Sequence, residues 1–392
     1  MAYSPHIRHF LSDTKQPVCK ESKIWNKQLP VQRSYFNNLT VPSDEHNISY
    51  NEYFKAIDTF FKEDRFESLL SAVRSYLKSE IDVYDLKEIG IFLKKHGALY
   101  HPARVEVMVK NKNLSFAVNV AISKEGRKYI QKEQAILKRL EKKFPFFPSI
   151  YHFREISLTD HKEKIPMFMA QWMDGFHEFH ISHDKTSDKR GIILWDQAKG
   201  NFFLSKDHTM KLYCQAAKIL TCLYNLETFE EVAFWNHAAG DFIVGISDDN
   251  KIELKLITVR SYKALFEIHE RDPLIILEAL LIFLINMSIK MRLDRLDGIG
   301  EIAWAHKNAV KGTIKGFFKG LSLKPEVKEL PDTPLACFKY YFSKLSQKDI
   351  YDLSLCLFKR WNKASPETPV IKKHLKYHAL ELYDAIYSTN LP

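Results

Sequence analysis

The sequence predicts an α+β fold in which a β-rich part is followed by a larger helical part. Two pairs of alternating apolar segments, at 103–123 and 192–205, have the spacing of β-hairpins. Around these hairpins, apolar residues recur at helical steps of three and four residues. Beyond Tyr262 the whole pattern is helical, so the second half is predicted to be mainly helix.

Residues 1–95 are predicted to form an N-terminal extension. Up to about residue 50 the chain is polar and contains four prolines, which predicts an irregular arm. From Ser49 to about Lys95 the apolar residues follow a helical stripe, which predicts two or three consecutive helices. We expect this extension to be an accessory region or cap.

Residues 96–175 are predicted to form a small β-rich lobe. ARVEVMVKN and LSFAVNVAIS read as a hairpin with a tight polar link at 111–113. The segment KEGRKYIQKEQAILKRLEKKF then carries an apolar helical stripe and ends before Pro145. Two further strands, IYHFREISL and MFMAQWM, lead through Asp174 and Gly175 into the next part.

Residues 176–392 are predicted to form a larger, mostly helical lobe. IILWDQAKGNFFLS reads as a hairpin that turns at Lys199 and Gly200, and Ser205 is placed to cap the long helix that follows. WNHAAGDFIV and a polar turn then lead to the strand IELKLITV, which ends at Arg260. The apolar segment from Pro273 is interrupted by Glu278, which favours a buried core helix over a membrane span.

Composition places the chain among ordinary globular proteins. Its 392 residues carry 58 Lys and Arg against 48 Asp and Glu, and the resulting charge of +10 is scattered rather than gathered in basic runs. This favours a solvated surface over a nucleic-acid partner. The five cysteines have no metal-binding spacing, and the first residues lack a signal peptide, so we expect a reduced, cytoplasmic protein.

The order of these elements resembles the two-lobed protein-kinase-like fold, in particular the aminoglycoside-phosphotransferase and lipopolysaccharide-kinase type. The resemblance covers about residues 96–300. It rests on FAVNVAIS followed by KEQAILKRLEKKFPFFPSIYHF, on MFMAQWMDGFHEF, and on AAGDFIV followed by KLITVR.

The resemblance implies a nucleotide site and a catalytic turn. Glu133 matches the helix glutamate that pairs with the phosphate-binding lysine, and Asn119 stands on the strand where that lysine is expected. Gln171 and Trp172 match the hinge that would hold an adenine, with ATP and Mg²⁺ as the implied cofactors. Asp241 would orient the acceptor hydroxyl and take its proton.

Several expected parts of such a site differ in this sequence. The first hairpin is preceded by HGALYHPARVEV rather than by a glycine-rich loop, and no lysine stands at the Asn119 position. Ile246 and Thr258 occupy the positions of the two metal ligands. Lys124, Lys128, Arg104 and Arg260 are candidate substitutes for the missing positive charge.

Two further hypotheses concern residues near Asp241. Arg260 ends a strand whose inner residues are apolar, so an inward-facing guanidinium needs a partner, and we predict Asp241. His237 is either a base, a ligand, or a side chain that hydrogen-bonds the turn backbone, and the last role is favoured.

HEFHISH places His177, His180 and His183 at three-residue spacing. The spacing suits one face of a helix but not the zinc-protease motif, so no metal site is predicted there.

Three functions remain open at this point. The first is a nucleotide-dependent phosphotransferase with altered metal and phosphate ligands, in which Asp241 is the base and the acceptor is an unknown small molecule or protein. The second is a pseudokinase that serves as a binding or regulatory module. The third is a basic protein that binds anions or nucleic acid.

Overall fold

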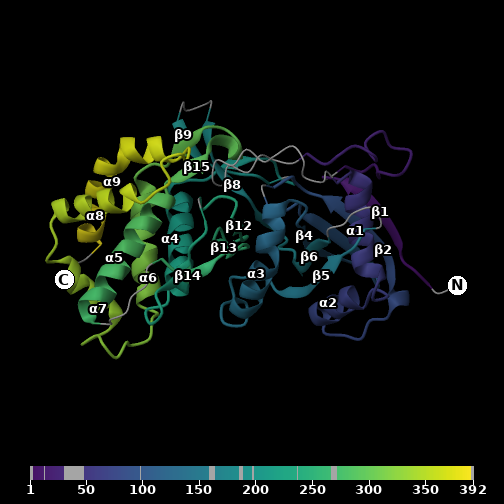
Figure 1. Cartoon of the computed structure of the whole chain (residues 1–392), viewed down its shortest axis with the longest axis horizontal. Helices are drawn as coiled ribbons and strands as arrows, with labels where there is room; N and C mark the ends of the chain where they lie inside the picture. The colour runs from purple at the N-terminus through teal and green to yellow at the C-terminus, as the bar shows by residue number, and fades with distance from the viewer. Residues whose placement is uncertain are drawn as a thin grey trace. The chain divides into compact units, whose positions relative to one another are not determined.

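The computed structural model describes residues 3–12, 14–30, 48–97, 99–158, 164–184, 189–196, 198–235, 237–265 and 272–389. The chain divides into two compact units, Met1–Asp174 and Gly175–Pro392, which are coloured purple to teal and teal to yellow in Figure 1. The first unit joins the predicted extension and the predicted β-rich lobe in one body. Most of the predicted irregular arm, residues 31–47, lies outside the described residues.

The first unit is built on a six-stranded sheet with the order β1-β2-β3-β4-β6-β5. β1 pairs with β2 in parallel, and the other neighbours are antiparallel. The strands are β1 (His6–Leu11), β2 (Leu86–Leu93), β3 (Ala103–Val109), β4 (Lys112–Val120), β5 (Ile150–Ile156) and β6 (Ile165–Gln171).

The predicted hairpin at 103–123 is confirmed as β3 and β4. Its turn consists of Lys110 and Asn111, both in the left-handed region with φ of 44° and 66°. Two consecutive residues with positive φ give the turn that best matches the twist of paired strands. The turn thereby fixes the register in which Val109 lies opposite Lys112.

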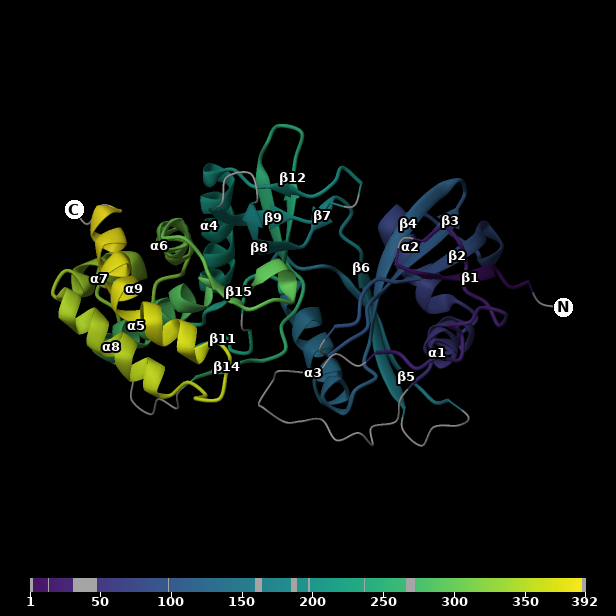
Figure 2. The same cartoon turned by 90° about the horizontal axis from the view of Figure 1, so that it is seen from above.

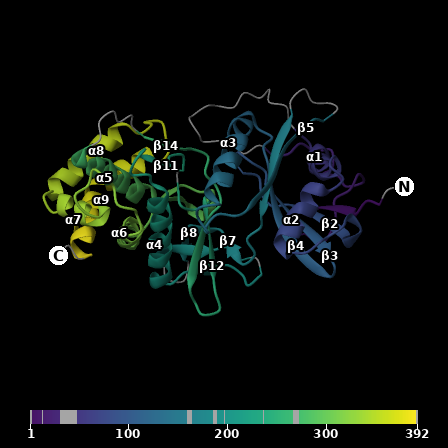
Figure 3. The same ribbon diagram turned by 90° about the horizontal axis from the view of Figure 1, so that it is seen from below.

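Helices cover the sheet of this unit on both faces. α1 (Tyr50–Lys62) and α2 (Glu67–Leu77) share a hydrophobic core with side chains such as Met167 and Met169 of β6. Successive side chains of a strand point to opposite faces, so Phe168 and Ala170 point to the other side. Figures 2 and 3 show α3 (Lys124–Leu140) on that side of β5 and β6.

Two predictions for this unit were wrong. Residues 6–11 form a strand rather than part of an irregular arm, and residues 86–93 form β2 rather than the end of a helical run. The helical run stops at Leu77, and a short 3-10 helix, Val83–Asp85, precedes β2. The apolar residues of LKEIGIFL are buried by pairing with β1 and β3, a tertiary effect that local periodicity does not contain.

The second unit combines small sheets with a helical body. β8 (Phe179–Asp184), β9 (Lys189–Leu194) and β10 (Phe202–Phe203) form one sheet, so the predicted hairpin with its turn near Gly200 is confirmed. β7 (Phe176–His177), β12 (Phe242–Ile246) and β13 (Ile252–Leu256) form another. The remaining pairs are β11 (Glu230–Val232) with β14 (Tyr262–Ala264), and β15 (Leu293–Arg295) with β16 (Ile302–Trp304).

In this unit α5 (Pro273–Lys290) contacts α6 (Asn308–Leu321), α7 (Pro334–Phe342), α8 (Gln347–Lys359) and α9 (Thr368–Ser388), while α4 (Lys206–Leu223) packs against α6 (Figure 1). Ser205 caps α4 as predicted, since its side chain accepts a hydrogen bond from the backbone N–H of His208. α5 is long and apolar enough to cross a membrane, but 61% of it is buried within the protein.

The prediction of helix throughout the chain beyond Tyr262 was wrong in part. β14, β15 and β16 and a 3-10 helix, Leu296–Gly298, interrupt the helices there. Each of these strands has only three residues, which is too short for alternation of apolar and polar residues to show in the sequence.

Candidate functional site

The candidate site of the second unit is built on the turn that carries Asp241. Gly240 precedes it with φ of +86°, a conformation that glycine adopts without steric cost, and β12 begins at the next residue after Asp241. In the β12/β13 hairpin Phe242 lies opposite Leu256, and the backbone N–H of Ile257 donates to the Asp241 carbonyl at 2.9 Å. The hairpin register therefore places the residues after β13 beside Asp241.

The Asp241 carboxylate is buried and held by two donors. The Thr258 hydroxyl donates to Oδ1, and Nη1 of Arg260 lies 2.7 Å from the same oxygen. Only 5% of the Asp241 surface is exposed. The predicted pair of Asp241 with Arg260 is thus confirmed. A carboxylate in this position is held in place by a permanent positive charge and a hydroxyl.

His237, which precedes the turn, contacts a residue far away in the sequence. Its Nε2 lies 3.3 Å from Oε1 of Glu367, the residue just before α9. Burial alone would raise the pKa of Glu367, but the contacts with His237 and the Ser365 hydroxyl outweigh burial and lower that pKa to about 2. His237 therefore ties the Asp241 turn to the beginning of α9.

A second charged pair, Glu231 and Lys290, lies close to this turn. Burial raises the pKa of Glu231, and burial lowers the pKa of Lys290, while the attraction between the two charges opposes both shifts. The charge of Lys290 also acts on Asp241, and its Nζ stands 5.2 Å from the Trp235 ring centre. Sequence analysis missed Glu231, Lys290 and Glu367. Lys290 and Glu367 are far from Asp241 in the sequence, and Glu231 belongs to a strand of three residues that has no sequence signal of its own.

The residues of the first unit that were predicted to bind a nucleotide include Glu133, Asn119 and Lys124. Glu133 is buried in α3, and the Tyr100 hydroxyl donates to its Oε2 at 2.6 Å. Asn119 lies on β4 opposite Phe168, and Lys124 is the exposed first residue of α3.

Gln171 and Trp172 stand at the end of β6. The Gln171 backbone N–H donates to the Ser149 carbonyl at 2.8 Å. Trp172 lies near two cationic side chains, Lys94 and Arg104, at 5.9 Å and 5.7 Å from its ring centre.

The three spaced histidines lie on strands, not on a helix. His177 belongs to β7, while His180 and His183 belong to β8, where residues three apart point to opposite faces. His177 lies 3.6 Å from Asp196, and His180 lies 3.2 Å from Asp294. Within the described residues, no group of three or more His, Cys, Asp or Glu side chains could hold a metal ion.

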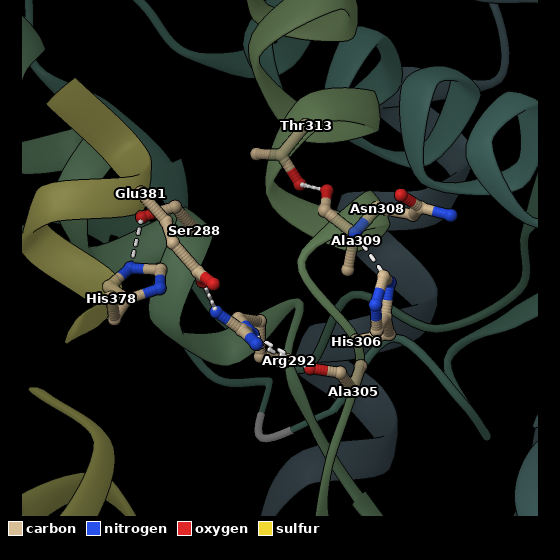
Figure 4. A network of polar contacts seen from close by, with 9 residues as sticks. All are labelled: Ser288, Arg292, Ala305, His306, Asn308, Ala309, Thr313, His378 and Glu381. Atoms are coloured by element: carbon tan, nitrogen blue, oxygen red, sulfur yellow. Dashed lines mark hydrogen bonds and ion pairs between the residues drawn. The ribbon is translucent and has the colours of Figure 1, made fainter. Parts of the chain in front are cut away.

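A separate polar network joins α5, β16 and α9 (Figure 4). The Arg292 guanidinium is buried, donates to the Ala305 carbonyl at 2.7 Å and 2.9 Å, and pairs with Glu381. Nε2 of His378 lies 3.0 Å from the Ser288 hydroxyl, which itself donates to the Ile285 carbonyl. Ser288 and His378 have no exposed surface, so this network joins the helices and does not meet a substrate.

Comparison with known proteins gives little further guidance. No protein-family model matches the chain, and no curated protein matches its sequence. Among solved structures, the chain is similar to choline kinase from Cryptosporidium parvum Iowa II, with 12% identity over 83% of this chain and 98% of that chain. The TM-score is 0.34, so we base neither fold nor activity on this likeness.

Proposed function

We propose that this chain is a kinase-like pseudoenzyme, a binding or regulatory module that does not carry out metal-dependent phosphoryl transfer. The observation that carries the proposal is the buried contact of Asp241 with Thr258 and Arg260. The order of elements supports the kinase-like part of the proposal: a strand, β4, leads into a helix with a buried glutamate, and α4 is followed by the Asp241 hairpin.

The geometry of the hairpin favours a metal-ligand position for Asp241 over the role of a base. In protein kinases, an Asn five residues after the catalytic Asp binds one Mg²⁺, and the Asp of a later DFG motif binds the other. Two such ligands must approach each other, as Asp241 and Thr258 do. In that alignment the position of the catalytic Asp falls on Asn236, which lies outside the described residues.

The residues at this place do not fit a magnesium ion. Mg²⁺ is usually held by one or two carboxylates together with water and phosphate oxygens. Here Thr258 stands in place of the expected carboxylate, and Asp241, at the other ligand position, already accepts bonds from that hydroxyl and from Arg260. The Arg260 guanidinium supplies the positive charge that a metal would otherwise provide.

The residue at position 119 supports the same proposal from the first unit. Phosphoryl transfer in kinases requires a strand lysine that pairs with the helix glutamate and neutralises phosphate charge. In this chain the strand position is Asn119, and a neutral amide cannot supply that charge.

The experiment is a thermal-shift titration with ATP, in the presence and absence of Mn²⁺. The wild type is compared with the double variant Thr258→Asp/Arg260→Gly, which restores the carboxylate pair and removes the guanidinium. We expect Mn²⁺ to leave the melting temperature of the wild type unchanged, with or without ATP. The double variant should gain a Mn²⁺-dependent stabilisation, because a ligand that binds only the folded state raises its stability.

A matched control is Thr228→Asp/Arg190→Gly, which makes the same exchanges at exposed positions of the same unit. Its response to Mn²⁺ should equal that of the wild type. If ATP stabilises the wild type only when the metal is present, and if the wild type also hydrolyses ATP in a metal-dependent way, the proposal is contradicted. The phosphotransferase hypothesis would then be favoured.

A further inference from the structure

The first unit contains a cavity of about 470 Å³ at the β5 edge of its sheet. Residues of α2, of α3 and of the start of β5 line it, and β5 is the last strand of the sheet. α2 and α3 cover opposite faces of the sheet, so residues from both sides of the edge strand line the cavity. Its size falls in the range of small-molecule sites.

One wall of the cavity presents a row of hydroxyl groups. Ser68, Ser71 and Ser75 follow each other at three- and four-residue steps along α2 and therefore share one helix face. Ser68 is 7% exposed, and its buried Oγ has no hydrogen-bond partner among the described residues. Buried hydroxyls nearly always have a partner, so the Ser68 hydroxyl has hydrogen-bonding capacity for a ligand in the cavity.

The opposite wall presents charges that the β5 backbone holds in place. Nζ of Lys138 donates to the Ile150 carbonyl at 2.7 Å, and Glu141 accepts from the Ile150 N–H at 2.6 Å. An ammonium has three donors and a carboxylate has two oxygens, so both groups keep bonding capacity toward the cavity. Lys142 adds a second, exposed cation.

The third side of the cavity contributes a neutral imidazole. Burial is the main cause that lowers the pKa of His152, and the charge of Arg154 lowers it further, so the ring is uncharged at neutral pH. The Nε2 atom of His152 is buried and has no hydrogen-bond partner among the described residues. Two cations against one carboxylate leave the cavity positively charged, which favours an anion.

We propose that this cavity binds a small phosphorylated polyol, such as a sugar monophosphate. Lys138 and Lys142 would contact the phosphate, because charge-assisted hydrogen bonds to a phosphate are strong. Glu141 and the serines of α2 would bond the hydroxyl groups of the ligand. This site belongs to the first unit alone, and the inference is independent of the proposed function.

The test is isothermal titration of the full-length protein with glucose phosphorylated on its primary hydroxyl. We expect this ligand to bind more tightly than free glucose, which lacks the phosphate for the lysines. It should also bind more tightly than inorganic phosphate, which lacks the hydroxyl groups for Glu141 and the serines. Lys142→Gln should weaken binding about tenfold, the loss expected for one charge-assisted hydrogen bond. Ser71→Trp, which fills the cavity from an exposed position, should abolish binding.

Lys132→Gln is the matched control, since Lys132 is an exposed lysine of α3 outside the cavity, and its binding should equal that of the wild type. Circular dichroism establishes that each variant is folded. The proposal is overturned if the wild type does not bind the sugar phosphate. It is also overturned if Lys142→Gln and Ser71→Trp bind it as well as the control does, or if inorganic phosphate alone binds equally tightly.

Discussion

The contact between Asp241 and Arg260 makes a quantitative prediction at the scale of a single residue. Arg260→Ala leaves the Asp241 carboxylate buried without its cation, and loss of one partner of a buried pair costs roughly 3 kcal/mol of stability. Urea unfolding of the variant should therefore show a much lower midpoint than the wild type.

Arg190→Ala is the control for this prediction, because Arg190 pairs with Glu301 at the surface, with side chains 47% and 70% exposed. Removal of an exposed pair costs at most about 1 kcal/mol. Equal losses in the two variants would show that the Asp241 carboxylate does not depend on Arg260.

His378 predicts how the stability of the protein responds to acid. Burial lowers the pKa of this histidine from its ordinary value of 6.5 to about 3, helped by the charge of Arg292. His378 therefore binds a proton near pH 6.5 in the unfolded chain, but only near pH 3 in the folded chain. Stability is full above pH 6.5 and falls as the pH drops toward 3, by at most about 1.4 kcal/mol per pH unit for this group.

The measurement is urea unfolding of the wild type and of His378→Gln over this pH range. Glutamine keeps a donor for the Ser288 hydroxyl but does not titrate, so the acid-dependent loss should be smaller in the variant. His6→Gln, at an exposed histidine, should keep the wild-type slope. An unchanged slope in His378→Gln would assign the acid sensitivity to other groups.

Some residue contacts follow from the sequence, and others do not. The pair of Asp241 and Arg260 is predictable, because an inward-facing guanidinium at a strand end needs a partner and a turn aspartate lies nearby. The contact of His237 with Glu367 is not, since 130 residues separate them and neither stands in a motif. A local pattern can identify a residue that needs a partner. A partner that is distant in the sequence can be identified only from the tertiary fold.

Packing of α4 against α6 makes a prediction at the scale of the element. Gly312, Gly316 and Gly320 recur every fourth residue on α6 and face α4. A Cβ at Gly312 would lie 2.6 Å from the Met210 carbonyl oxygen, and one at Gly320 would lie 2.6 Å from Cβ of Thr221. The missing side chains thus let the two helix backbones approach closely.

Gly316→Ala should destabilise the protein, although alanine is the better helix former by about 1 kcal/mol. A Cβ at this position would overlap the Cys214 carbonyl group, and overpacking of a tight interface typically costs about 1–3 kcal/mol. The measurement is the melting temperature, with Lys315→Ala on the exposed face of α6 as the control. If Gly316→Ala melts at or above the wild-type temperature, α4 and α6 do not need glycine to pack.

Elements are predictable from the sequence where their signals are local. The β3/β4 hairpin and the cap of α4 were predicted from a short turn and from one serine before an apolar stripe. β2 was mistaken for helix, because it is stabilised as a strand by its pairing with β1 and β3 and not by a local signal. The three-residue strands beyond Tyr262 are also set by their partners, so their own sequences contain no signal.

At the scale of the whole molecule, the α+β class agrees with the prediction, and the described part of the extension does not stand apart from the β-rich lobe. α1 and α2 share a core with the sheet, and β1 and β2 complete it. The described residues between 3 and 95 are therefore an integral part of one folded unit. The apolar stripe of these helices predicted that one helix face is buried, but it did not identify the sheet as the surface that covers this face.

The parallel pairing of β1 with β2 has a consequence for synthesis of the chain. His6 lies opposite Glu88, so the first strand leaves the ribosome about 80 residues before the strand that it joins. At roughly 5–20 residues per second, the nascent chain spends several seconds or more with this strand exposed and unpaired. Chaperones that bind emerging chains have that interval in which to act.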